Sequence, residues 1–84
     1  MTFVNIGYGN TIARDRIVLV CGPDSSPVKR MIQDARDHGR AIDVSCGRKT
    51  RSVIVTDSDH VILTALSPDV LSARIGAETV AEEE

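Results

Sequence analysis

Three short runs of the chain are apolar at consecutive positions, and this pattern limits the possible folds more than any other feature. The runs are IVLVC at 17–21, VIV at 53–55 and VIL at 61–63. A strand that alternates apolar and polar residues buries one face of a sheet, whereas a continuous apolar run requires cover on both faces. The sequence therefore predicts a sheet that is buried on two sides.

Two segments are predicted to be helices. The main one is SPVKRMIQDARDHG at 26–39, where four apolar residues recur with helical spacing. These residues are Val28, Met31, Ile32 and Ala35. Ser26 and Pro27 are typical of a helix start, and Gly39 is typical of a helix end. Residues 67–75 repeat the Ser-Pro start and predict a second, short helix.

The predicted elements follow the order β, β, α, β, β, β, α, which indicates an α/β (α+β) domain. We expect a small, mainly antiparallel five-stranded sheet with one long and one short helix. Residues 41–66 would form an antiparallel meander, with turns at GRKT and at residues 57–59. Two small helices cannot cover both faces of five strands, so we expect other copies of the chain to complete the cover in a homo-oligomer.

The charge distribution divides the chain into one domain at 1–75 and an acidic tail at 76–84. The domain holds all ten Lys and Arg against eight Asp, whereas the tail holds four Glu and no base. Such a tail is predicted to be disordered. No signal-peptide pattern and no apolar run of about 20 residues is visible, which predicts a cytoplasmic protein with no membrane partner.

A basic cluster is the main candidate for a binding site. Within SCGRKTRSV at 45–53, Arg48, Lys49 and Arg51 fall in four positions, and Arg14 and Arg16 form a second pair expected on one strand face. Grouped cations bind phosphate backbones, although a solvated hairpin tip has the same composition. One copy would make roughly three to five phosphate contacts, too few for tight binding in physiological salt. Repetition in an oligomer would multiply them.

Other patterns favour structural roles. TDSDH at 56–60 could supply metal ligands but is more typical of a turn between strands. Cys21 and Cys46 lack a CxxC motif and predict buried, reduced thiols rather than a zinc site. Gly7 and Gly9 predict a turn. We therefore expect no enzyme, cofactor, metal site or small-molecule substrate.

Three longer strings resemble one known family. They are NIGYGN, PDSSPVKRMIQDARDHG and GRKTRSVIVTDSDHVILT, which together span about residues 4–65. This part of the chain closely resembles the RemA family of bacterial extracellular matrix regulators. The resemblance implies a ring-forming transcriptional regulator that binds double-stranded DNA and controls genes of biofilm matrix and osmoprotection.

The resemblance also implies site residues. The family's DNA-contacting positions correspond to Arg16, Arg48, Lys49 and Arg51. Lys49 departs from the arginine of the family pattern, which keeps the charge but loses the planar, two-pronged donor. We therefore predict a nucleoid-associated regulator in the cytoplasm. An interaction module that binds RNA or an acidic protein through the same basic loop remains the alternative.

Overall fold

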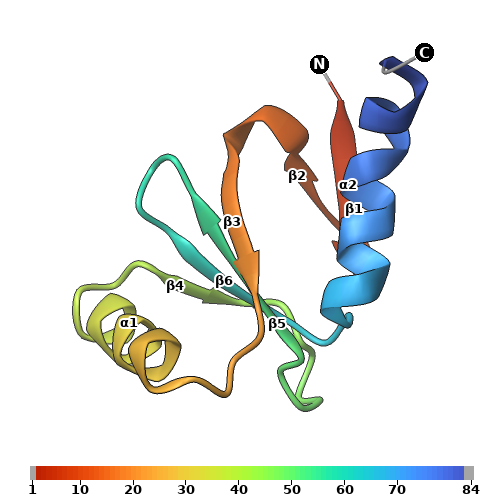
Figure 1. The fold of residues 1–84 in the computed structure, drawn as a ribbon. Helices are drawn as coiled ribbons and strands as arrows, with labels where there is room; N and C mark the ends of the chain where they lie inside the picture. Colours follow the sequence, from red (N-terminus) through yellow and green to blue (C-terminus); the bar gives the residue numbers. More distant parts are fainter. Residues whose placement is uncertain (1, 83–84) are drawn as a thin grey trace.

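The computed structural model describes the backbone of residues 2–82 and side chains through Gly76, and it shows a small α+β fold (Figure 1). The elements are β1 Phe3–Gly7, β2 Asn10–Ala13, the 3-10 turn η1 Arg14–Arg16, β3 Ile17–Cys21, α1 Ser26–Asp37, β4 Ala41–Asp43, β5 Ser52–Thr56, β6 Val61–Thr64 and α2 Pro68–Glu82. None of the helices in this described part is long and apolar enough to cross a lipid bilayer.

The predicted count of five strands in one sheet is wrong, because residues 2–82 form six strands in two sheets. β1 and β2 pair as an antiparallel ribbon, and the other four strands lie in the order β3-β5-β6-β4. The extra strand arises because Gly7, Tyr8 and Gly9 all have positive φ and reverse the chain directly after β1. Residues 10–13 then pair back along β1.

The predicted meander at 41–66 is also wrong. β5 pairs with β6 in the antiparallel sense, but β4 pairs with the other side of β6 in the parallel sense. Residues 44–51 are therefore no hairpin tip. They form a loop that crosses from one side of β6 to the other, tied by Val44 N–H to the Leu63 carbonyl and by Arg51 N–H to the Thr64 carbonyl, both at 2.9 Å.

The two central strands are buried on both faces, as the continuous apolar runs predict. On one face Val53 and Leu63 pack with Ala35 of α1. On the other face Ile54 and Ile62 pack with β1 and with α2. Figure 1 shows α1 on one side of the sheet and the β1–β2 ribbon with α2 on the other. The chain thus supplies most of its own cover by means of the ribbon, which the sequence did not reveal.

Both helix starts use serine caps. The α1 cap is Ser25, one residue before the predicted Ser26, and its hydroxyl accepts from the Val28 N–H at 3.4 Å. Gly39, with φ of +70°, follows the end of α1 as predicted. α2 has 15 residues against 12 in α1, so the expectation that it is the short helix is wrong. The disorder predicted for 76–84 stays a prediction, and residues 83 and 84 lie outside the described residues.

Candidate nucleic-acid interface

Residues 44–51, which we call the basic loop, carry the predicted basic residues, and the start of this loop has a defined structure. One carboxylate oxygen of Asp43 accepts from the Ser45 hydroxyl at 2.6 Å and from the Ser45 N–H at 2.9 Å. These two hydrogen bonds, the hydroxyl foremost, hold the pKa of Asp43 below its ordinary value. Cys46 and Gly47 then turn the chain with φ of 56° and 78°, and Arg48 N–H donates to the Ser45 carbonyl. The cations that follow are exposed.

The turn between β1 and β2 lies against the same end of β6. The Thr64 hydroxyl donates to the Ile6 carbonyl at 2.6 Å and ties β1 to this end. At Gly7 an added Cβ would lie 3.4 Å from the Leu66 side chain, so the turn packs closely on the segment after β6. Tyr8 is thereby placed beside the basic loop, where its ring centroid lies 5.5 Å from the guanidinium carbon of Arg48.

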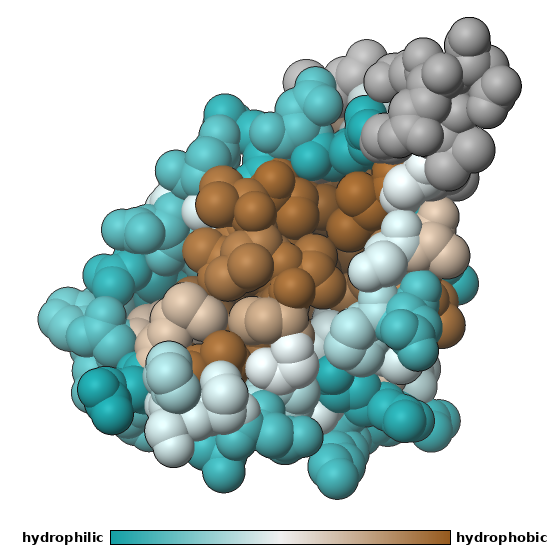
Figure 2. Space-filling model, viewed as in Figure 1, coloured by the Kyte–Doolittle hydropathy of each residue, from teal (hydrophilic) through white to brown (hydrophobic). Residues whose placement is uncertain are grey.

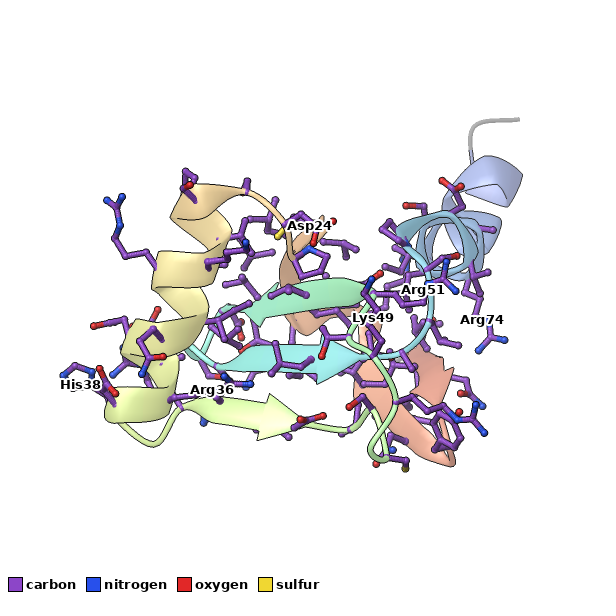
Figure 3. All side chains as sticks on the ribbon, turned by 90° about the horizontal axis from the view of Figure 1, so that it is seen from below. Asp24, Arg36, His38, Lys49, Arg51 and Arg74 are labelled. Carbon is purple, nitrogen blue, oxygen red and sulfur yellow. The ribbon has the colours of Figure 1, made fainter. Side chains whose placement is uncertain are left out.

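α2 brings a further cation to this place. The helix begins soon after β6 ends, and Nη1 of Arg74, the seventh residue of the helix, donates to the carbonyl of Asn5 in β1 at 2.9 Å. The basic loop, the Tyr8 turn and α2 therefore meet at the carboxyl end of β6. Figure 3 shows Lys49, Arg51 and Arg74 toward the α2 end of the molecule, far from Arg36 and His38.

These three segments enclose an open groove of about 520 Å³, which we call the basic groove. Its lining residues are Asn5, Gly7, Tyr8, Arg48, Lys49, Arg51, Ala65, Leu66 and Arg74. Four of these are cations, and none of these described lining residues is a carboxylate. A neighbouring hollow of about 510 Å³ shares Lys49 and Arg51 but also contains Asp24. The positive charge is therefore concentrated on the side of the loop that faces Tyr8 and α2.

The second predicted basic pair does not belong to this groove. Arg14 and Arg16 lie in η1 rather than on one strand face. Arg16 pairs with Asp57 at 3.2 Å, and Arg14 donates to the Ile75 carbonyl. η1 lies next to the end of β5 at Thr56, whereas the basic loop enters β5 at Ser52. At ~3.3 Å per residue, these two ends of β5 are roughly 13 Å apart. Three of the four predicted DNA-contacting residues are thus brought together, and Arg16 is separate.

Two of the groove's residues were missed from the sequence. Arg74 is the only Lys or Arg in residues 52–84, so no cluster of basic residues marks it in the sequence. Tyr8 lies between Gly7 and Gly9, for which the sequence predicts only a turn.

The expectation that both cysteines are buried is wrong for Cys46. Its side chain is exposed, because β4 ends at Asp43 before reaching it. Cys21 is half-buried, and this burial raises the pKa of its thiol.

The predicted turn in TDSDH is confirmed. Residues 57–59 join β5 to β6, and Thr56 N–H donates to the His60 carbonyl. The Ser58 hydroxyl lies 2.8 Å from Nδ1 of His60, and Asp57 is engaged by Arg16. Within the described residues, no group of three or more His, Cys, Asp or Glu side chains is arranged to hold a metal ion.

Comparison with known proteins gives one consistent result. A family model described as "RemA-like: Extracellular matrix regulatory protein A-like" matches residues 3–75. A protein of Geobacillus thermodenitrificans is 50% identical over 99% of this chain and 97% of its own length. A protein of Halothermothrix orenii is 50% identical over 93% of each chain, and one of Clostridium botulinum is 51% identical over 96% of this chain and 87% of its own. Each of the three carries the name "Putative regulatory protein".

Proposed function

The chain belongs to the RemA-like family, and we propose that it binds double-stranded DNA through the basic groove, repeated around a homo-oligomer. The family and the names of the relatives indicate a regulatory role. The observation that carries DNA binding is the groove itself. Two segments far apart in the sequence, the basic loop and α2, place four cations around one hollow, and its described lining includes no carboxylate. Clustered Lys and Arg are the usual partners of backbone phosphates.

The aromatic content of the groove favours a duplex over a single strand. Binding of single strands commonly depends on several aromatic side chains, on which successive bases stack. The basic groove offers only Tyr8 among its described lining residues, and Arg48 lies over this ring. Contacts to backbone phosphates need no unstacked base, so a duplex fits the groove better. Sequence preference would then come largely from the bending and shape of the DNA.

Self-association is supported by an uncovered strand. β3 is an edge strand of the four-stranded sheet, and Val18 and Leu19 are 66% and 48% exposed. Figure 2 shows a contiguous apolar patch surrounded by polar residues on this face of the molecule. An open groove of about 510 Å³ between β3 and α2 adjoins these residues. Exposed apolar patches and free strand edges are typical of protein interfaces, and we propose a second copy of the chain as the occupant.

Repetition would convert weak contacts into useful affinity. One groove offers four cations, and each phosphate neutralised changes the logarithmic salt slope of binding by roughly 0.9. Several copies in a ring would bind one duplex together and add their contacts. Arg16 would contact a separate phosphate, because it lies at the opposite end of β5 from the basic loop.

The proposal also covers the biological setting. We place the protein in the cytoplasm, associated with the nucleoid and without catalytic activity. Because the family is described by extracellular matrix regulation, we propose transcription of biofilm matrix genes as its output. Transcript profiling of a deletion strain tests this last part separately, since unchanged matrix transcripts would remove it while leaving DNA binding intact.

A competition experiment tests the binding partner. Purified protein is bound to labelled duplex DNA and challenged with unlabelled duplex, single-stranded RNA or an acidic protein. We expect duplex DNA to compete best, and Lys49→Ala to weaken binding to every duplex sequence alike. Stronger competition by RNA or by the acidic protein would favour the alternative, an interaction module that uses the same basic groove.

A further inference from the structure

We propose that Arg74 of α2 is a phosphate-binding residue, so that one DNA strand passes between α2 and the basic loop. The inference rests on the proposed DNA binding and extends it in two respects. It adds a contact from a helix that sequence reasoning did not connect with nucleic acid. It also specifies the side of the basic loop along which the strand runs.

The position of Arg74 fits this role. Its side chain is exposed, and Nη1 donates to the Asn5 carbonyl at 2.9 Å, which holds the guanidinium at the wall of the basic groove. An arginine side chain has five N–H donors, and this contact uses one of them. The other donors remain for an incoming oxygen. A guanidinium held at one corner loses little conformational freedom when a phosphate binds.

The charges around Arg74 also point to an anion. The described residues give Arg74 no ion pair, whereas Arg16 and Arg40 each pair with an aspartate. Arg48, Lys49 and Arg51 line the same groove, so four like charges face one hollow. Such an arrangement is unfavourable without a counter-charge and attracts polyanions. A backbone phosphate, which binds bidentately to guanidinium groups, would supply this charge.

The two hollows beside the basic loop determine the path. Lys49 and Arg51 border both, so charge on these residues alone does not select a side. The second hollow, which the segment before α1 and the start of α2 at Pro68 also border, contains Asp24, whose carboxylate would repel phosphate. The basic groove has Arg74 and Arg48 in place of this acid. A strand that contacts Lys49 and Arg51 is therefore favoured to continue past Arg74.

The test compares two variants of Arg74 in the full-length protein. Arg74→Gln keeps a polar amide but removes the charge, and Arg74→Lys keeps the charge. Duplex affinity is measured from about 50 to 300 mM salt. We expect Arg74→Gln to weaken binding at least ~3-fold at physiological salt and to flatten the salt slope by roughly 0.9 for each groove in contact. Arg74→Lys should keep the wild-type slope.

Two further variants separate the possible outcomes. Arg30→Gln, on the exposed face of α1, is the matched control and should leave the slope unchanged. Arg48→Ala/Arg51→Ala tests the proposed function itself. If this double variant loses affinity while Arg74→Gln keeps the wild-type slope, the role of Arg74 is refuted and DNA binding stands. If the wild-type protein ignores duplex DNA, both proposals are wrong. Thermal unfolding identifies a purely structural role, because lost folding would lower Tm without a selective change in slope.

Discussion

Arg48 and Tyr8 lie together although they come from distant parts of the chain: the guanidinium carbon is 5.5 Å from the ring centroid. Tyr8 adopts φ of 54°, a left-handed conformation that costs a non-glycine residue about 1–2 kcal/mol. The contact with Arg48 stabilises by about 0.5–1 kcal/mol at an exposed site. The backbone cost is therefore only partly offset by this contact, and we expect the ring to have a second role, the positioning of Arg48.

Substitutions at Tyr8 should separate stability from binding. Tyr8→Ala keeps the strained backbone and loses the ring, whereas Tyr8→Gly loses the ring and relieves the strain. We expect Tyr8→Gly to be more stable than Tyr8→Ala by about 1 kcal/mol, or ~4–8 °C in Tm. Both should bind duplex DNA equally and more weakly than wild type. Wild-type affinity in Tyr8→Gly would show that the ring does not position Arg48.

The ion pair of Arg16 with Asp57 gives a second prediction. Asp57 partly neutralises Arg16, so Asp57→Asn should strengthen duplex binding by making Arg16 fully available. The gain should disappear in an Arg16→Ala background, because no guanidinium remains to be released. Asp59→Asn, in the same turn, controls for the general loss of one negative charge. An equal gain from Asp57→Asn with and without Arg16 would show that the gain does not come from the release of Arg16.

Asp43 gives a prediction about pH. Its folded-state pKa is below the ordinary value, so ionised Asp43 stabilises the folded protein above about pH 4, and this contribution is lost as the pH falls through the lowered pKa. Asp43→Asn should therefore reduce the free energy of unfolding at pH 7, with the difference from wild type shrinking below about pH 4. Chemical denaturation at several pH values measures this. A difference that does not change with pH would contradict the assigned hydrogen bonds.

The apolar edge of β3 gives a prediction about assembly. Val18→Asp places a charge at a side chain that is 66% exposed in the single chain, so it should leave the fold intact. If β3 is the interface, the variant should elute as a smaller species and bind duplex DNA more weakly. Thr11→Asp, on the exposed side of β2, is the control and should assemble normally. Normal assembly of Val18→Asp would place the interface elsewhere.

The sequence predicted local structure better than strand order. Helical spacing at Val28, Met31, Ile32 and Ala35 located α1, and the continuous apolar runs identified β5 and β6 as buried on both faces. The predicted strand pairing was wrong for residues 41–56. Both edges of β6 can accept a partner strand, so residues 44–51 can form either a hairpin or a crossover, and the local sequence does not decide between them. A basic turn in the sequence has the same composition in either arrangement.

The candidate site was partly predictable for the same reason. Arg48, Lys49 and Arg51 are close in the chain, so their grouping is visible without a structure. Arg74 and Tyr8 join them only because β1, the loop and α2 meet at the end of β6. Arg16 was expected to share a strand face with Arg14, but the 3-10 turn separates their side chains and their partners.

The salt dependence of duplex binding tests the central claim most directly. The affinity of the wild-type protein and of Arg48→Ala/Arg51→Ala is measured on one duplex over a range of salt concentrations. We predict a steep slope for the wild type and a slope flatter by roughly 1.8 or more for the double variant, since each copy loses two phosphate contacts. Equal slopes for the two proteins would show that the basic groove does not hold the DNA.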